Sequence, residues 1–252
     1  HRSGDGPGDM TGQPVEIRTL SEVAELVELG DVLRRVWGSD TPIVNLEMAR
    51  AIGYSGGYVA GAYLETGGAE PTMVGASVGL LAVHEGRPAL HSHVTGLLPE
   101  ARHSGVGRRV KMHQRSWAAE RDIDWITWTF DPLVRRNAWF NIAVLGAEVH
   151  DYLTDFYGTM TDAINAGDSS DRLHVAWRVS EPDPGQPRDG TGVANAQLVP
   201  TPDDIVTLRR TDPAAVAGWR ERTRHALTAA LAAGDRIVGF TRDGNYVIGS
   251  PP

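Results

Sequence analysis

The hydrophobic and polar positions along the chain follow the two repeats that distinguish strands from helices. Residues 15–20 alternate apolar and polar side chains, as a short strand does, and a helical repeat follows for which Ser21 is the expected N-cap. Residues 125–130 are continuously apolar, with β-branched and aromatic side chains, as in a buried central strand. The same patterns predict strands at 57–65, 73–83, 89–97 and 174–179, and helices at 21–37, 45–52, 108–121 and 133–146.

The pattern changes towards the C-terminus. Residues 180–197 are rich in Pro, Gly and Asp, which predicts a linker or a long surface loop. Beyond them we expect a helix at 213–234 and a hairpin with its turn at 242–245. Arg220 and Arg224 share one face of that helix, which we expect to be solvated, with binding of a carboxylate substrate or a second subunit as the alternative.

These patterns divide the chain into four parts. The first 14 residues are Gly-rich and polar, so we expect a disordered leader or a remnant of added residues there, with Met10 as a native start. A tail of roughly 50 residues is too short for a core of its own, so it should pack on the main domain or on a second subunit, which leaves a homodimer possible. The predicted parts are a leader at 1–14, a main domain at 15–180, a linker or surface loop at 181–200 and a C-terminal helix–hairpin extension at 201–252.

Composition and charge narrow the classes of protein to which this chain can belong. Its 252 residues, 41% hydrophobic and 22% charged, are enough for a full core and ordinary for a globular protein. A net charge of −8 argues against general nucleic-acid binding, which needs a basic surface. No apolar run approaches the roughly 20 residues that span a bilayer, so we expect no membrane partner. Cysteine is absent, which excludes disulfides and thiol nucleophiles and fits a cytoplasmic protein.

One short stretch combines glycine with an unusual charge pattern. Residues 102–110, RHSGVGRRV, join a predicted strand to a predicted helix, and Arg108, Arg109 and Lys111 fall in the first turn of that helix. A helix start carries partial positive charge and normally attracts acidic residues. Residues 102–115 nevertheless contain five Lys or Arg residues and no acidic residue. We infer a site for a small anionic ligand there, with a Gly-rich turn and a solvated basic face as the alternative.

The order of strand, R-x-x-G-x-G loop, helix, buried strand and helix resembles the GNAT superfamily of acyl-CoA-dependent N-acyltransferases. A closer resemblance, to a bacterial branch of the superfamily, extends over about residues 15–179 through the runs LHSHVTGLLPEARHSGVGRRVKMHQR, WITWTFDPLVRRNAWFNIAVLGA and YGTMTDAINAGDSSDRLHVAW. The resemblance implies the GNAT fold, which is a mixed α/β (α+β) domain with a largely antiparallel central sheet flanked by helices. The residues that carry it are His93, Val94, Thr95, Gly96, Leu97, Leu98, Pro99, Arg102, Gly105 and Gly107.

In that superfamily the backbone N–H groups of this loop hold the pyrophosphate of coenzyme A at the positive end of the following helix. Glycine lets the backbone approach the phosphates without a clash from Cβ. The resemblance therefore implies acetyl-CoA or another acyl-CoA as co-substrate. The cofactor-binding residues that it implies are Leu97, Leu98, Arg102, His103, Ser104, Gly105, Val106, Gly107, Arg108 and, on the helix after the buried strand, Asn137.

The usual member of the superfamily has a Tyr near the end of the helix after the buried strand, placed to protonate the departing thiolate. Residues 141–143 here read NIA, so this Tyr is absent. Asn141, one helical turn after Asn137, is a candidate to hydrogen-bond the sulfur. Tyr152 and Tyr157 are candidate acids, because a phenol with a pKa near ~10 can protonate a thiolate. The alternative role for either phenol is that of a core aromatic with a bonded hydroxyl.

His93 and Asp131 are the candidate bases for an amine nucleophile. Histidine titrates near neutrality, and Asp131 ends the buried strand just before a proline. A hydrogen-bonded structural histidine and a simple Asp-Pro turn are the alternatives. His91 shares a strand face with His93, but no third metal ligand is evident from the spacing, and we expect no metal.

The function that follows from the resemblance is transfer of an acetyl or other short acyl group from acyl-CoA to the amine of a small molecule. The amine attacks directly, without a covalent enzyme intermediate, while a backbone amide near Leu97 and Leu98 polarises the thioester carbonyl. Two alternatives stay open. One is a non-catalytic acyl-CoA-binding regulatory module on the same fold, which the missing Tyr favours. The other is different thioester chemistry, either O-acylation or decarboxylation.

Overall fold

The computed structural model describes residues 15–65, 70–102, 104–158 and 168–249, and it divides the chain into two compact units. The first unit contains the residues up to 82 together with residues 92–121, and the second contains residues 83–91 and those from 122 onward. The division falls inside the predicted domain at 15–180, and the second unit includes the described part of the predicted C-terminal extension.

The first unit is built on the strands β1 (Val15–Thr19), β2 (Tyr58–Leu64), β3 (Thr72–His84) and β4 (Arg87–Leu97), which are hydrogen-bonded in that order. The last two residues of β3 and the first half of β4 belong to the second unit. The β1–β2 and β2–β3 pairs are antiparallel. Every residue of β2 is buried, as expected for an inner strand that is covered on both faces. The four predicted positions for these strands are confirmed to within a few residues.

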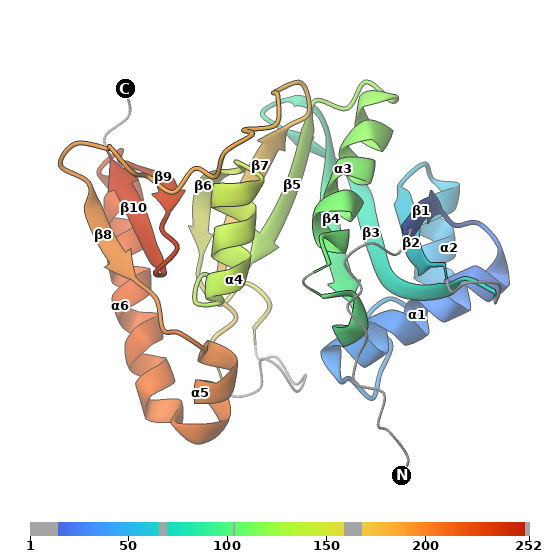
Figure 1. Cartoon of the computed structure of the whole chain (residues 1–252), viewed down its shortest axis with the longest axis horizontal. Helices are drawn as coiled ribbons and strands as arrows, with labels where there is room; N and C mark the ends of the chain where they lie inside the picture. Colours follow the sequence, from blue (N-terminus) through green and yellow to red (C-terminus); the bar gives the residue numbers. More distant parts are fainter. Residues whose placement is uncertain (1–14, 66–69, 103, 159–167, 250–252) are drawn as a thin grey trace, which may run out of the picture. The chain divides into compact units, whose positions relative to one another are not determined.

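Helices cover both faces of this sheet (Figure 1). The helices α1 (Val23–Trp37) and α2 (Leu46–Tyr54) pack on the face that carries Met73. The helix α3 (Val106–Ala119) packs on the opposite face, which carries Val74. Because successive side chains of a strand point to opposite faces, these two neighbours in β3 belong to two separate apolar clusters.

The start of α1 differs from the prediction. Its N-cap is Glu22 and not Ser21, because Glu22 and Glu25 form a capping box in which each side chain accepts a hydrogen bond from the backbone of the other. This box needs a residue three positions before Glu25, which Ser21 is not. The predicted start of α2 is confirmed, since Asn45 Oδ1 accepts a hydrogen bond from the N–H of Met48 at 2.8 Å.

The second unit contains the other strands of the main sheet. The first half of β4 pairs in parallel with β5 (Trp125–Phe130), which lies where predicted. Antiparallel pairs then join β5 to β7 (Arg172–Arg178) and β7 to the edge strand β6 (Glu148–Leu153), which was not predicted. The full order of this largely antiparallel sheet is β1-β2-β3-β4-β5-β7-β6.

The segment after β5 differs from the single α-helix predicted at 133–146. The short helix α4 (Arg135–Ala138) continues directly into η2 (Trp139–Val144), which is π-helical, with Leu145 N–H donating to Phe140 O at 2.9 Å. Helices of this type are rare and occur frequently at functional sites. The apolar pattern did not reveal the change, because a single wider turn shifts the hydrophobic spacing by only one residue.

The C-terminal residues of the second unit form a small sheet of their own. Its antiparallel order is β8 (Gln197–Pro200), β10 (Asn245–Gly249) and β9 (Arg236–Phe240). The predicted hairpin is confirmed as β9 and β10, and Gly244 (φ 90) lies in its turn. The strand β8 was not predicted, because four residues are too few to show a periodic pattern.

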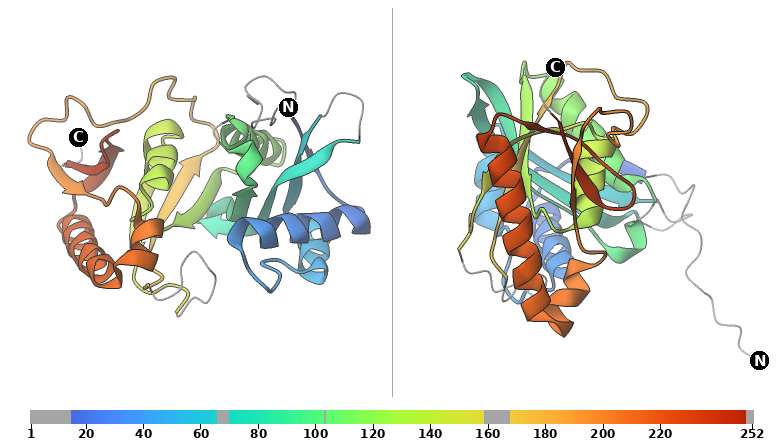
Figure 2. Two further views of the ribbon diagram at one scale, coloured as in Figure 1. Left: turned by 60° about the horizontal axis from the view of Figure 1, so that its bottom comes forward. Right: turned by 90° about the vertical axis from the view of Figure 1, so that its left-hand side faces the viewer.

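Two helices complete the second unit. The helix α6 (Pro213–Ala232) was predicted and lies alongside β8 (Figure 2), whereas α5 (Ile205–Thr211) was not predicted. Ile205 of α5 and Val216 of α6 form a buried cluster with Leu133, which follows β5. The helices therefore pack against the segment that leads into α4. Within the ranges that the structure describes, no helix combines the length and the apolarity that crossing a membrane requires.

Candidate functional site

The R-x-x-G-x-G stretch forms the turn between β4 and α3 in the first unit. After β4, the short helix η1 (Pro99–Ala101) leads to Arg102, whose Nε donates to the carbonyl of Leu97 at 3.2 Å. Gly105 is the N-cap of α3, with φ 79 in the left-handed region. No acidic residue lies in the first turn of α3. The helix start therefore presents its backbone N–H groups and the positive end of its dipole at this loop.

Gly107, the second residue of α3, has no structural requirement for glycine. Its φ is not positive, and a Cβ built on it would meet Leu97 Cδ1 at 3.5 Å, which is an ordinary contact. Glycine in a helix is nevertheless less favourable than alanine by about 0.8–1.0 kcal/mol. Neither backbone strain nor a close contact therefore explains the glycine at this position.

The basic residues of this stretch do not all face the loop. Arg108 is exposed and Arg102 is half-buried. Arg109, in contrast, donates to the carbonyl of Val15 in β1. Lys111 is buried, with 5% of its surface exposed, so the expectation that it contributes charge to the loop was wrong. Each helical residue is rotated by roughly 100° from the last, which turns Lys111 towards the sheet.

Lys111 belongs instead to a buried polar cluster beneath α3. Its Nζ donates to Ser92 Oγ at 2.9 Å and to Gln114 Oε1 at 3.2 Å. Gln114 Nε2 donates to Ser92 Oγ at 3.0 Å and to Ser77 Oγ at 3.3 Å. Burial lowers the pKa of Lys111 to about 7, because desolvation penalises the ammonium form.

The remaining residues predicted to hold the cofactor in this loop occupy distinct places. The N–H of Leu98 donates to Val74 O at 2.9 Å, so the sheet already uses this amide, and its side chain is buried. Leu97 is only half-buried. Ser104 Oγ donates to Ala101 O at 2.7 Å, which leaves its oxygen as an acceptor. Val106 is buried against the sheet. His103 lies outside the described residues.

The two histidines of β4 differ in their surroundings. His93 has an exposed side chain in the first unit, although nearby protein atoms still desolvate it enough to lower its pKa. His91, in the second unit, lies 3.0 Å from Thr127 Oγ1 of β5 through its Nδ1. His93 is thus the more accessible of the pair, and its lowered pKa keeps the imidazole neutral at pH 7.

Asn137 and Asn141 lie on either side of the junction between α4 and η2. Asn137 is half-buried at the end of the α-helical part, and Asn141 is buried inside the π-helical part. The carbonyl of Asn141 accepts a hydrogen bond from the N–H of Ala147 at 3.0 Å. The wider turn thus changes the direction of Asn141 relative to the regular helix on which the prediction was based.

Asp131 lies at the centre of a buried ion-pair cluster. It accepts hydrogen bonds from Arg209 and from Arg220, whose Nη1 lies 2.8 Å from Asp131 Oδ1. Both arginines also bind Asp168. Burial alone would raise the pKa of Asp131, but the charge of Arg220 and its hydrogen bond, with that of Arg209, outweigh burial and lower the pKa. A carboxylate held in this way is a weak base, so the geometry favours a structural role for it.

The two tyrosines proposed as acids also differ. Tyr152 OH donates to Asp171 Oδ2 at 2.6 Å, and burial together with this carboxylate raises the pKa of the phenol. Tyr157 is exposed, and its hydroxyl lies 3.4 Å from Thr129 Oγ1 of β5. A phenol whose proton is held by a buried carboxylate is a poorer proton donor than an exposed one. The geometry therefore favours Tyr157.

Arg220 and Arg224 of α6 do not lie on a solvated face, which corrects the expectation for these two residues. Arg220 is buried, and Arg224 binds Asp171 with its Nη2 at 2.8 Å from Asp171 Oδ1. Asp131 and Tyr152, two of the predicted catalytic residues, are therefore both tied to α6 through this cluster. The helical spacing of these arginines was visible in the sequence, but the carboxylates that they bind lie at least 52 positions away along the chain.

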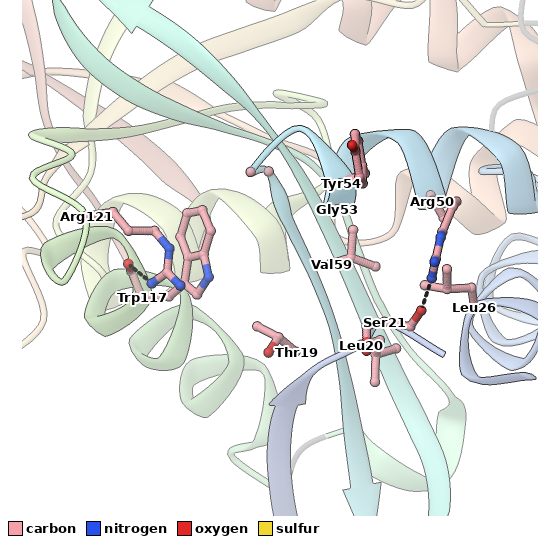
Figure 3. A pocket seen from close by; sticks show the side chains of 13 residues that line it. Thr19, Leu20, Ser21, Leu26, Arg50, Gly53, Tyr54, Val59, Trp117 and Arg121 are labelled. Carbon is pink, nitrogen blue, oxygen red and sulfur yellow. Dashed lines mark hydrogen bonds between the residues drawn. The ribbon is translucent and has the colours of Figure 1, made fainter. Parts of the chain in front are cut away.

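A pocket of about 350 Å³ lies in the first unit, away from the glycine loop (Figure 3). It is lined by the ends of β1 and α2 and by Trp117 and Arg121, which come from the last turn of α3 and just beyond it. Because α3 has 14 residues, its two ends are separated by roughly 20 Å. The pocket is therefore at the opposite end of α3 from Gly105, and the predicted cofactor residues do not line it.

No protein-family model matches this sequence, and no curated protein does. Solved structures do match in fold. The ribosomal-protein-S18-alanine N-acetyltransferase from Escherichia coli has a TM-score of 0.51 at 13% identity, over 68% of this chain and 97% of that one. Arabidopsis thaliana Naa50, in complex with the bisubstrate analogue CoA-Ac-MVNAL, has a TM-score of 0.50 at 18% identity, over 64% of this chain and 97% of that one.

An acetyltransferase of the GNAT family from Streptococcus pneumoniae also matches, with a TM-score of 0.50 at 12% identity, over 66% of this chain and 99% of that one. Identities this low establish the fold and not the chemistry. The matches agree with the observed mixed α/β architecture, its largely antiparallel sheet and its flanking helices. The predicted fold class is thereby confirmed: this chain has the GNAT fold.

Proposed function

We propose that this protein transfers an acyl group from acyl-CoA to an amine. The observation that carries the proposal is the start of α3, where a left-handed glycine turn, Arg102 and Arg108 occur together without an acidic residue in the first helical turn. A helix start of this kind is a ready site for phosphate groups. The pyrophosphate of coenzyme A supplies the negative charge that the arrangement calls for.

The proposed reaction needs one bond to form and one to break. The neutral amine nitrogen attacks the thioester carbonyl carbon, the new C–N bond forms, and the C–S bond breaks to release the coenzyme as a thiolate. The nitrogen loses one proton and the thiolate gains one. We assign polarisation of the carbonyl to the backbone at Leu97, because the N–H of Leu98 is already donated to Val74. His93 is the proposed base, because it is exposed and neutral at pH 7.

The identities of the acyl group and of the acceptor amine are further parts of the proposal. We propose a short acyl group such as acetyl, and the amine of a small molecule as acceptor. A polypeptide N-terminus is a second amine of the same chemical class. It is supported by the names of the Escherichia coli enzyme, which specify a ribosomal protein, and of the Arabidopsis complex, whose analogue carries MVNAL. A panel of amines must therefore contain both classes.

Binding to the glycine loop is tested first, by calorimetric titration with acetyl-CoA, succinyl-CoA and free coenzyme A. The variant is Arg102→Ala/Arg108→Ala, and the matched control is Arg121→Ala, which removes an arginine at the other end of α3. Charge-assisted hydrogen bonds contribute about 1.5–3 kcal/mol each, so loss of two should weaken binding by about 100-fold or more. The control should bind like the wild type, and circular dichroism verifies that each variant is folded.

Failure of all three ligands to bind the wild-type chain would overturn the proposal, as would equal binding by the double variant. If acyl-CoA binds, release of free thiol is then measured with small amines and with peptides that have a free N-terminus. Turnover with either class establishes the acyl transfer and names the acceptor class.

A second function is favoured by one observation. Asp131 and Tyr152, two of the residues predicted to be catalytic, are held in hydrogen bonds that oppose catalysis. This supports a non-catalytic acyl-CoA-binding module. Tight binding without thiol release from any amine would select this function over acyl transfer.

A further inference from the structure

Histidine side chains gather in the second unit, apart from the residues used in the proposed reaction. His84 is the last residue of β3, Glu85 follows it in the turn, and His150 lies on the edge strand β6. Atoms of these three residues that can bind a metal all lie within 4.8 Å of one another. The rings of His84 and His150 meet edge to face, with centroids 4.7 Å apart.

The ring nitrogens of this cluster are unsatisfied. The Nε2 atoms of His84 and of His150 are both buried and have no hydrogen-bond partner. Buried polar side-chain atoms are paired in the large majority of cases, because an unpaired one has lost its bonds to water without replacement. Two such atoms in one small cluster point to a bound group that satisfies both of them.

The backbone is unusual at two of the three residues. The pairing of β6 with β7 shifts register between Val149 and Asp151, so His150 lies at a β-bulge. Bulges often re-aim a side chain next to a functional site. Glu85 and Gly86 both have positive φ, 49° and 72°, in the turn between β3 and β4. Such two-residue turns strongly prefer Asn, Asp or Gly at the first position, which makes glutamate there exceptional.

Further polar groups lie close to the cluster. Nearby, His174 Nδ1 faces Asp151 Oδ2 at 3.5 Å, and the His174 ring centroid lies 5.8 Å from that of His84. Glu85 is exposed at the turn, so its carboxylate can move towards the two rings.

We propose that His84, Glu85 and His150 bind one divalent transition-metal ion, and that Zn²⁺ fits them best. Imidazole nitrogen and carboxylate oxygen are ligands that Zn²⁺ accepts at about 2.0–2.2 Å, and three protein ligands leave a fourth position for a solvent molecule. The ion satisfies both orphan nitrogens and neutralises the carboxylate. It joins the turn between β3 and β4 to β6, which is otherwise paired on one side only within the main sheet.

The spacing of these residues in the sequence conceals the site. His84 and His150 are separated by 65 intervening residues and belong to different strands, so no metal-binding motif is visible along the chain. The sequence therefore led to the expectation of no metal, based on the pair His91 and His93 alone.

The test is calorimetric titration of the full chain with Zn²⁺ after treatment with a chelator, together with Co²⁺ substitution followed by visible absorption. The variants are His150→Gln and Glu85→Gln, and the control is His225→Gln, which removes an exposed histidine of α6. Glu85 lies on the surface, so Glu85→Gln keeps the test valid even if a variant in the half-buried ring pair does not fold. Thermal unfolding with and without Zn²⁺ gives a readout that does not depend on activity.

We expect one Zn²⁺ per wild-type chain and a rise in Tm on its addition. His150→Gln should weaken binding by more than the roughly 10–100-fold that loss of an outer-shell partner costs. Glu85→Gln should weaken it measurably, and His225→Gln should leave it unchanged. Equal Zn²⁺ binding by the wild type, Glu85→Gln and His150→Gln would overturn the proposal, because the ion would then bind elsewhere. Absence of stoichiometric binding to the wild type would overturn it too and would leave a buried water as the partner of the two nitrogens.

Discussion

Gly105 and Gly107 lie two residues apart at the start of α3, but the backbone requires only the first of them. Gly105 has φ 79, where an L side chain is strained, whereas Gly107 is helical and has room for a Cβ. Substitutions at these two positions can therefore distinguish effects on folding from effects on ligand binding at the same loop.

Gly107→Ala should therefore change stability and binding in opposite directions. Alanine is the better helix former, so the free energy of unfolding should stay the same or rise by up to about 1 kcal/mol. Binding of acetyl-CoA should weaken, because the new methyl group occupies space beside the helix N–H groups. Urea unfolding and calorimetry check the two effects. Gly105→Ala is the comparison and should lose about 1–2 kcal/mol of stability from the left-handed backbone alone. Unchanged acetyl-CoA binding by Gly107→Ala would contradict the proposal that the phosphates of coenzyme A bind at this loop.

Removing the hydroxyl group of Tyr152 should affect stability, whereas removing that of Tyr157 should affect catalysis. Tyr152→Phe removes a hydrogen bond to the buried Asp171 and should cost about 1.5–3 kcal/mol of stability. Tyr157→Phe removes an exposed hydroxyl and should leave stability within about 0.5 kcal/mol. If Tyr157 is the acid, its variant should show a reduced kcat with unchanged acyl-CoA affinity. A normal kcat for Tyr157→Phe would remove it from the mechanism.

Lys111 is predicted to make stability depend on pH on the alkaline side. Its pKa is about 7 in the folded chain and about 10.4 in an unfolded one, so the unfolded state binds more protons between these values. The free energy of unfolding should therefore rise with pH from about 7 to 10, with a limiting slope of about 1.4 kcal/mol per pH unit. Lys111→Met should lose this slope. Parallel pH profiles for the two proteins would show that the ammonium is not desolvated.

Secondary-structure elements of the second unit are joined by buried charge as well as by apolar packing. α5 and α6 supply Arg209 and Arg220, and both bind Asp131 after β5 and Asp168 before β7. Each helix is amphipathic only in part, because its inner face carries these arginines. The ion pairs therefore act together with the buried Val216 and Leu227 to turn this face of α6 inward.

Arg220→Met should destabilise the second unit strongly. Removing one partner of a buried ion pair leaves an uncompensated charge, which costs about 3–5 kcal/mol. The control is Arg222→Met on the same helix, where an exposed arginine lies over Trp219 at 4.6 Å and contributes about 1 kcal/mol or less. Chemical unfolding of both variants measures the difference. Similar losses for the two would mean that Asp131 and Asp168 are solvated in the folded chain.

At the scale of the whole molecule, buried carboxylates that bind arginines control stability in acid. Burial would raise the pKa of Asp171, but hydrogen bonds from Arg224 and Tyr152, with others from the backbone, lower it to about 2. A carboxyl group with a depressed folded pKa contributes stability that is fully present above its unfolded pKa of about 3.9 and is lost as pH falls towards the folded value. Asp131 acts in the same direction.

Asp171→Asn should consequently unfold more easily than the wild type at pH 7, by on the order of 2 kcal/mol. The difference should shrink between about pH 4 and pH 2, because the wild-type carboxylate takes up a proton there and loses its advantage. Equilibrium unfolding across this pH range measures it. A difference that stays constant down to pH 2 would assign the loss to packing and not to charge.

The sequence predicted most of the regular elements, and the failures have physical causes. β5 was predicted at its observed bounds because a continuous apolar run of that length has few other structures open to it. β6 was missed because its residues, EVHDYL, mix polar and apolar side chains without clean alternation and bend at a bulge. The π-helical η2 was missed because one wider turn leaves almost no trace in the pattern.

Only part of the candidate site could be predicted from the sequence. The glycine loop at residues 102–108 is local in the chain, so its turn, its helix start and its charge could be read from neighbouring residues. Contacts between residues far apart in the chain could not be predicted in this way. The burial of Lys111 and the ion pairs of Asp131 depend on which helix face meets which strand, and no local pattern records that.

By itself, the sequence determined most of the strands and helices and their order, the glycine turn before α3 and the hairpin at the C-terminus, because each depends on neighbouring residues and backbone preference. Only the tertiary structure decided that Arg220 binds Asp131, that Lys111 faces the core and that His84, Glu85 and His150 lie together. These contacts join residues far apart in the chain, and their charge states follow from desolvation, which exists only once the chain has packed.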